Sequence, residues 1–405
     1  MIKSLRLINW KSFADATLYI DPLTVIIGMN ASGKSNILDA LCFLQRIASG
    51  IPVTTAIVGD ERISPLRGGL DFCTRNQSKF FSLTAIITDT AANEFQYHIK
   101  ISHDSHKAQI ATESIIAMDS KFQYLDASFD NNNLTFSRKF SIKSTNNKPE
   151  LSGFDNTSAL SILYQKDEFA ETKDIIYYIS YLFRNIFILD PIPSHMRGYA
   201  PLSEALNPDA SNIAGVLAAL SEDEKNSIES TLTSYLKQLP ERDIERVWTE
   251  RVGRLASDAM LYCEENWDGK TPQLLDARGM SDGTLRFLAI VAALLTCKEG
   301  SLLVIEEIDN GLHPSRADTL VDMLRTLGAR RNIDVIVTTH NPALLNALGP
   351  EMVPFISVTH RDSSGASAIT LLEDIDALPK LMAGGPLGRI VSEGRLESAL
   401  QRAGD

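Results

Sequence analysis

A glycine-rich segment of eight residues near the start of the chain most constrains the fold. Its sequence, Gly28-Met29-Asn30-Ala31-Ser32-Gly33-Lys34-Ser35, fits the pattern G-x-x-x-x-G-K-[ST]. The apolar run 23–27 precedes it, and a segment with apolar side chains at helical spacing follows it. A buried strand, a glycine loop and an amphipathic helix in this order form a phosphate-binding loop. The segment therefore predicts an α/β fold with a parallel sheet, and a coincidental glycine turn is the alternative.

The residue types in this segment suit the phosphates of a nucleotide. Glycines let the backbone turn so that N–H groups point at phosphate oxygens. Lys34 would place a positive charge beside the β- and γ-phosphates, and Ser35 would offer a hydroxyl to Mg²⁺. The helix that follows directs the positive end of its dipole at the same anion. We therefore expect a nucleotide site that also holds Mg²⁺.

A pair of acids follows a second apolar strand. The run 302–305 ends in Glu306 and Glu307. Ligands of open α/β sheets bind at the carboxyl ends of the strands, where two adjacent acids are costly without a cation or a reaction. One acid could hold the water shell of the metal, and the other could orient or deprotonate a water. Because adjacent strand residues point to opposite faces, we expect their roles to differ. An exposed acidic loop is the alternative.

Two further signals are weaker when taken alone. Ser281 opens the nearly all-apolar helix 285–295, either as a cap only or as a second phosphate grip. His340 follows the buried run 335–338 and fits a polar switch or an ordinary imidazole equally well.

The order of these motifs resembles that of ATP-binding-cassette (ABC) ATPases of the SMC, RecF and OLD type, which are AAA-family relatives. The resemblance covers residues 1–78 and 272–400 and implies an ABC-ATPase-like α/β P-loop core built from both chain ends. We expect that core at 1–90 and 270–405, with an inserted antiparallel β and helical region at 91–269.

The resemblance also implies a role for each matching residue. Lys34 and Ser35, with Gly33, form the Walker A motif, and Glu306 is the Walker B acid. Glu307 is the catalytic glutamate. The further assignments are Asn30 facing the γ-phosphate, Lys11 and Ser12 on the nucleotide side, Ser281 and Gly283 in the signature, Asp309 in the D-loop, and His340 as the switch histidine. Gln77 is a candidate for the Q-loop residue.

The function implied is hydrolysis of ATP with Mg²⁺ by a homodimer whose ATP sites are shared between subunits. Closure on ATP would control a separate effector protein, a nuclease or toxin, in bacterial defence against phage. A RecF-like DNA-binding repair ATPase without an effector is the alternative, so DNA stays open as a partner.

Composition excludes several other classes. The formal net charge is −12, whereas a protein covered by nucleic acid needs a positive face. No run approaches 18 apolar residues, and the start of the chain lacks the apolar region of a signal peptide. The four scattered cysteines fit reduced core thiols. These features predict a cytoplasmic protein without a membrane span.

Four local expectations complete the prediction. Residues 1–27 should form two strands joined by a turn at Asp21-Pro22, and residues 80–145 an antiparallel sheet with turns at 131–133 and 146–147. Residues 203–265 should be helical and broken at Pro240. The mixed charges of 241–246 should lie on one salt-bridged helix face.

Overall fold

A parallel sheet assembled from distant parts of the chain forms the centre of the molecule. The computed structural model describes residues 1–103, 107–129, 137–140, 150–152, 156–165, 173–239, 244–266 and 271–403. The strand order is β10-β15-β16-β3-β17-β18, and all neighbours are parallel except the hairpin β17–β18. The strands are β3 (Leu23–Gly28), β10 (Ile186–Leu189), β15 (Leu302–Ile305), β16 (Asp334–Thr338), β17 (Ile356–Arg361) and β18 (Ser367–Leu371).

Burial explains why these short apolar runs become central strands. Every residue of β3, β15 and β16 is buried, as expected for strands covered on both faces. The predicted strands 302–305 and 334–338 are confirmed, and so is 186–189.

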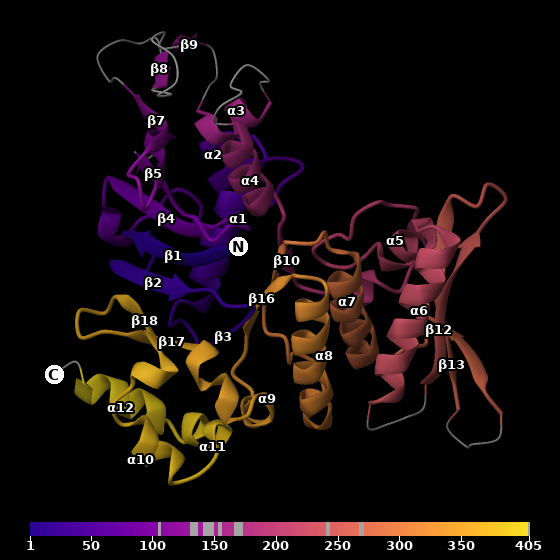
Figure 1. Ribbon diagram of the computed structural model, residues 1–405. Helices are drawn as coiled ribbons and strands as arrows, with labels where there is room; N and C mark the ends of the chain where they lie inside the picture. Colours follow the sequence, from indigo (N-terminus) through magenta and orange to yellow (C-terminus); the bar gives the residue numbers. More distant parts are fainter. Residues whose placement is uncertain are drawn as a thin grey trace.

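An antiparallel sheet of eight strands lies beside the parallel one (Figure 1). Its order is β2-β1-β4-β5-β6-β7-β8-β9. The strands are β1 (Ile2–Ile8), β2 (Asp15–Tyr19), β4 (Phe80–Thr88), β5 (Glu94–His103), β6 (Ala108–Ala117), β7 (Gln123–Phe129), β8 (Ser137–Phe140) and β9 (Glu150–Ser152). The alternating pattern predicted for 80–117 is confirmed. The predicted turns at 131–133 and 146–147 lie outside the described residues.

Helices cover both sheets. Those of the N-terminal half are α1 (Lys34–Ala48), α2 (Val53–Val58), α3 (Ala159–Tyr164) and α4 (Lys173–Arg184). Those of the C-terminal half are α7 (Asp282–Thr296), α8 (Ala317–Arg330), α9 (Pro342–Ala347), α10 (Leu378–Met382), α11 (Leu387–Ser392) and α12 (Arg395–Ala403). A triad of rings, Trp10, Phe43 and Phe81, with centroids 4.8–5.9 Å apart, joins α1 to the antiparallel sheet. The predicted α/β P-loop core made from both chain ends is confirmed.

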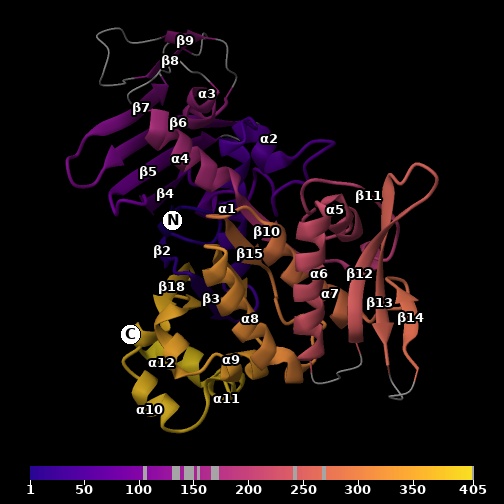
Figure 2. The same cartoon turned by 45° about the vertical axis from the view of Figure 1, so that its right-hand side comes forward.

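A separate lobe carries α5 (Ile213–Ala219) and α6 (Glu222–Lys237) against a small sheet (Figure 2). Its strands are β11 (Ala200–Pro201), β12 (Ile244–Val252), β13 (Asp258–Glu265) and β14 (Gln273–Asp276). The expectation of helix up to residue 265 is therefore wrong. In β12 the side chains of Val247 and Thr249 are buried while Arg246 and Glu250 are exposed, which is the period of a strand. Of the charged residues at 241–246, Glu245 and Arg246 thus lie on a strand and not on a helix face, whereas Pro240 and residues 241–243 lie outside the described residues.

The start of the chain also differs from expectation. Residues 1–27 contain three strands, because a turn at residues 9–14 separates β1 from β2. Asn9 and Lys11 adopt positive φ angles of 51° and 49° there. No glycine or proline occurs in this turn, so the sequence lacks the two residue types that mark turns most strongly. The boundaries 1–90, 91–269 and 270–405 stay a prediction, although β10, from inside 91–269, belongs to the parallel sheet.

The four cysteines are free thiols, and Cys42 and Cys297 are only half-buried. Cys73 and Cys263 are buried, and burial raises the pKa of Cys73 to about 11 and that of Cys263 to about 12. Among the helices of the described residues, none has the length and apolar character needed to cross a membrane.

A substitution at Gly28 tests how tightly the glycine loop is packed. A Cβ there would lie 2.3 Å from the carbonyl oxygen of Thr359, at a φ of 147°. We expect Gly28→Ala to lower the free energy of unfolding by roughly 2–4 kcal/mol in chemical denaturation, because clash and backbone strain add. Gly365→Ala is the control, since Gly365 has a φ of 75° but nothing within 4 Å of its added Cβ. Equal losses in the two variants would contradict the packing.

Candidate functional site

The predicted phosphate-binding loop lies at the carboxyl edge of the parallel sheet. β3 ends at Gly28, and α1 begins at Lys34 with Gly33 as its N-cap. Gly28, Ala31 and Gly33 have φ angles of 147°, 63° and 123°. These left-handed positions let the loop curl over the first turn of α1, where backbone N–H groups have no partner within the helix.

The hairpin β17–β18 holds this loop from the other end of the chain. Arg361 Nη2 donates to the carbonyl oxygen of Ala31 at 2.7 Å. Ser367 Oγ donates to the carbonyl oxygen of Ser32 at 2.5 Å, and Ser32 Oγ lies 2.6 Å from Thr359 Oγ1. The conformation of the loop therefore depends on residues more than 300 positions away.

The lysine of the motif points back into the loop. Lys34 is buried, and its Nζ donates to the carbonyl oxygens of Gly28 at 2.6 Å and Met29 at 3.0 Å. Burial lowers the pKa of Lys34, and the nearby carboxylates of Glu307 and Glu306 oppose that shift. The structure thus brings Lys34 and both acids of the predicted pair into one electrostatic neighbourhood.

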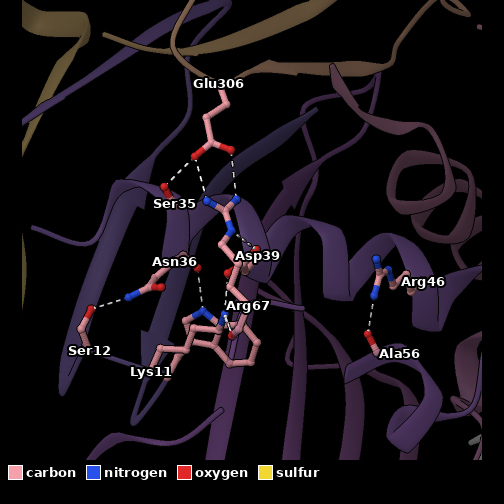
Figure 3. A network of polar contacts seen from close by, with 10 residues as sticks. Lys11, Ser12, Ser35, Asn36, Asp39, Arg46, Ala56, Arg67 and Glu306 are labelled. Carbon is pink, nitrogen blue, oxygen red and sulfur yellow. Dashed lines mark hydrogen bonds and ion pairs between the residues drawn. The ribbon is translucent and has the colours of Figure 1, made fainter. Parts of the chain in front are cut away.

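Ser35 and Glu306 are in direct contact, as Figure 3 shows. Ser35 Oγ donates to Glu306 Oε1 at 2.6 Å. Burial alone would raise the pKa of Glu306, but hydrogen bonds from Arg67 and Ser35 outweigh it, so the pKa falls below its usual value. A hydroxyl and an ionised carboxylate at this distance are hard oxygen donors of the kind that Mg²⁺ prefers. The two residues therefore fit the predicted metal role.

The position of Glu307 differs from the one that strand alternation predicts. β15 ends at Ile305, so both acids lie beyond the strand and the expected alternation of faces does not apply. Glu307 has a φ of 45°, and its backbone N–H donates to Thr338 Oγ1 at 2.8 Å. A non-glycine residue in this strained conformation needs a surrounding structure that enforces it. Here the end of β16 supplies that support.

Lys11 and Ser12 are hydrogen-bonded to side chains of α1. Lys11 Nζ donates to Asp39 Oδ2 and, at 2.7 Å, to the carbonyl oxygen of Arg67. Asn36 Nδ2 donates to Ser12 Oγ at 2.7 Å (Figure 3). Burial lowers the pKa of Lys11, and Asp39 opposes that shift. Both predicted residues are therefore linked to α1.

A cavity of about 880 Å³ opens beside these residues. Its lining includes Lys11, Ser12, Asn36, Arg67, Arg75 and Gln77. Basic and polar side chains dominate this set, which suits an anionic ligand, although no residue of the glycine loop 28–35 lines this cavity. Gln77, the Q-loop candidate, thus lies near the site.

No sequence pattern indicated two of the functional candidates, Arg67 and Asp39. Arg67 Nη1 and Nη2 donate to Glu306 Oε1 and Oε2 at 2.9 and 3.0 Å, and Arg67 Nε donates to Asp39 Oδ1 at 3.3 Å. Arg67 comes from the segment between α2 and the 3₁₀ turn Arg75–Gln77. A single arginine in such a segment carries no periodicity or motif of its own. Asp39 is one polar position in an amphipathic helix, and its burial could not be read from the pattern.

The predicted signature residues lie at the start of α7. Ser281 caps α7, because its Oγ accepts from the N–H of Thr284 at 3.1 Å. Gly283 packs against the predicted D-loop, where an added Cβ would meet the carbonyl oxygen of Gly311 at 2.8 Å. Within the described part of the chain, no hydrogen bond joins Ser281 or Gly283 to residues 28–35. The cap is confirmed, and the phosphate contact stays a prediction.

The remaining predicted residues surround the same edge of the sheet. Asp309 Oδ1 accepts from Thr339 Oγ1 at 2.5 Å, which ties the predicted D-loop to the end of β16. His340, which follows Thr339 in the sequence, is exposed. Asn30 is also exposed, at the tip of the glycine loop. The structure leaves the roles of His340 and Asn30 as predictions.

A nucleotide-binding protein of the P-loop class is defined by these features together: the glycine loop with its lysine and serine, and the pair of acids. Within that class the chain belongs to the AAA domain family, whose profile matches residues 4–240. A second profile, described as "AAA domain, putative AbiEii toxin, Type IV TA system", matches residues 212–346.

Individual relatives match either a short stretch of the chain or most of it at low identity. A stretch of 43 residues is 54% identical to the chromosome partition protein Smc of Rhodopirellula baltica, and it spans 10% of this chain but only 4% of that protein. A crystal structure of an Smc head bound to the C-winged helix domain of ScpA is 14% identical, with a TM-score of 0.48 over 91% of this chain and 96% of that one.

A Thermotoga maritima SMC head domain is 13% identical, with a TM-score of 0.42 over 91% of this chain and 98% of that one. A Pyrococcus furiosus Smc head with an extended coiled coil, bound to the C-terminal domain of ScpA, is 11% identical, with a TM-score of 0.48 over 94% and 99%. With TM-scores below 0.5, these likenesses add nothing to the fold, which follows from the strand order.

Lys34→Ala tests the glycine loop as a phosphate site. Removing the only side-chain charge of residues 28–35 should weaken ATP binding by about 10- to 100-fold in calorimetry, since charge-assisted contacts to phosphate are lost. Lys380→Ala removes an exposed lysine on α10 and should leave the affinity unchanged. An ATP affinity in Lys34→Ala equal to that of the wild type would refute the assignment.

Proposed function

We propose that this chain is a dimeric ABC-type ATPase that hydrolyses ATP and uses the resulting closure and opening to control an effector protein. The observation that carries hydrolysis is the convergence of Lys34, Ser35, Glu306 and Glu307 at one edge of the parallel sheet. A site that only bound nucleotide would need the lysine and the loop. The second acid, held at a strained backbone angle, adds a group suited to handle water.

The reaction proposed is attack of water on the γ-phosphorus of ATP. A bond forms from the water oxygen to phosphorus, the bond from phosphorus to the bridging β,γ-oxygen breaks, and ADP and inorganic phosphate result. Glu307 orients the water and takes up its proton. Lys34 stabilises the charge that spreads over the phosphate oxygens. Ser35 and Glu306 would hold Mg²⁺, which when bound neutralises charge on the β- and γ-phosphates.

A second copy of the chain completes the site in this proposal. The cap of α7 is exposed at Ser281 and lacks a hydrogen bond to the glycine loop of its own chain within the described residues. Backbone N–H groups at a helix start bind anions well. An isologous dimer would bring α7 of one subunit to the ATP of the other. ATP then favours closure, and ADP, which lacks the γ-phosphate, favours opening.

The proposed effector is a separate nuclease or toxin, and the setting is bacterial defence against phage. Two observations support this part of the proposal. The order of motifs resembles that of stand-alone OLD-type ATPases, and the profile over residues 212–346 carries the name of a toxin of a toxin–antitoxin system.

Glu307→Gln separates binding from hydrolysis. The amide is nearly isosteric with the acid but cannot take up a proton, so turnover should fall by about 10²-fold or more while ATP affinity changes little. A phosphate-release assay and calorimetry measure the two quantities. The trapped ATP-bound dimer should accumulate in size-exclusion chromatography, and it then serves as bait for the effector in a native pull-down. Hydrolysis near the wild-type rate would move the catalytic role away from Glu307.

Mixed dimers test whether the site is shared. Lys34→Ala and Ser281→Arg should each be inactive alone. Mixed under exchange conditions, they should recover up to about a quarter of the wild-type rate, because half of the dimers are mixed and each keeps one intact site. The expected rate is lower if the two sites cooperate. A mixture that stays inactive although mixed dimers form would count against independent sites shared between subunits.

A further inference from the structure

Arg67 occupies the carboxylate to which we assign the metal. Its guanidinium makes a two-pronged pair with Glu306, at 2.9 Å to Oε1 and 3.0 Å to Oε2. Ser35 Oγ donates to the same Oε1 at 2.6 Å. Figure 3 shows the guanidinium facing both carboxylate oxygens, with Ser35 beside them. One carboxylate thus receives three hydrogen bonds from the two side chains that flank it.

The rest of Arg67 is anchored away from the metal residues. Its Nε donates to Asp39 Oδ1 at 3.3 Å, and its carbonyl oxygen accepts from Lys11 Nζ at 2.7 Å. Asp39 and Lys11 are buried and paired with each other, with side chains only 7% and 5% exposed. The Arg67 side chain is 52% exposed. The arginine is therefore anchored at its backbone carbonyl oxygen and at Nε, while about half of its side chain surface is exposed to solvent.

We propose that Arg67 is a latch that competes with Mg²⁺ for Glu306. This inference rests on the proposed function, because it takes Glu306 and Ser35 as the metal residues. A guanidinium paired with both carboxylate oxygens and a divalent cation near the same oxygens exclude each other by charge and space. The nucleotide site therefore has a latched form, in which Arg67 holds Glu306, and an open form that accepts the metal.

The anchors make release of the latch inexpensive. Asp39 faces Arg67 Nε on one side and Lys11 on the other, so a guanidinium that leaves Glu306 keeps an acidic partner. It is also half exposed and gains water as it turns away. A wholly buried arginine without a second acid would be held in place by the cost of an unpaired charge. The latch thus opens for a metal bound together with nucleotide phosphates, whose combined contacts replace those of Arg67.

An ordinary structural salt bridge is the competing interpretation. Such a pair would stabilise the site with the metal bound or absent, and its removal would weaken both nucleotide and metal binding. A latch has the opposite sign, because its removal frees Glu306 for the metal. The direction of the change in metal dependence therefore separates the two interpretations.

The experiment measures binding of a fluorescent, non-hydrolysable ATP analogue by the full chain, with excess Mg²⁺ and with EDTA. The informative quantity is the ratio of the two dissociation constants. In Arg67→Ala, Mg²⁺ should strengthen binding about three- to tenfold more than in the wild type, since two charge-assisted hydrogen bonds no longer oppose the metal. Arg67→Lys keeps the charge but loses the two-pronged geometry, so its ratio should lie between those of Arg67→Ala and the wild type.

Arg62→Ala is the matched control, because Arg62 is an exposed arginine five positions earlier in the same segment. Its ratio should equal that of the wild type. A ratio that is unchanged or smaller in both Arg67 variants would overturn the latch, provided that circular dichroism shows at least one of them folded as the wild type is. Failure of the wild-type chain to bind the analogue at all would instead contradict the proposed function together with the latch.

Discussion

The parallel pairing of β3 with β16 and β17 is the constraint on which the rest of the structure depends. Leu23 lies opposite Val335, and Val25 lies opposite Ile356, so strands from the two ends of the chain sit side by side. Closing so long a loop costs entropy, although the cost rises only slowly with length. Complete burial of these apolar strands offsets it. The glycine loop then acquires its shape from Arg361, Thr359 and Ser367, which the same pairing delivers.

The same pairing places the acids. β15 is the next strand after β16, and parallel neighbours end at a common edge, so Glu306 arrives beside Ser35. Glu307 is held one residue further by Thr338 at the end of β16. Two features of the site come from outside the sheet. Arg67 reaches Glu306 from a connecting segment, and the cap at Ser281 has no hydrogen bond to its own glycine loop within the described residues. We propose that Arg67 moves and that the cap at Ser281 is shared between subunits, whereas the residues held by the sheet stay fixed.

The sequence predicted the secondary structure best where one strong local signal determined the backbone conformation. Short apolar runs such as 302–305 and 334–338 gave strand bounds that the structure reproduces, because runs of four or five residues suit a strand buried on both faces and are too short for a typical helix. The turn at residues 9–14 was missed because its positive φ angles fall on Asn9 and Lys11, not on glycine. β12 was taken for a helix because its charges suggested helical pairs, whereas alternation of Val247 and Thr249 with exposed residues decides the strand. Arg67 is a tertiary contact, so no pattern along the chain marks it.

A structure of the chain with Mg²⁺ and a non-hydrolysable ATP analogue tests the account most directly. We expect the phosphates in the loop 28–35, the metal held by Ser35 and reached by Glu306, and the guanidinium of Arg67 withdrawn from Glu306. We also expect a two-fold dimer in which the γ-phosphate meets the cap of α7 from the other subunit. Phosphates bound elsewhere, or Arg67 still paired with Glu306 while the metal and nucleotide occupy the loop, would contradict it.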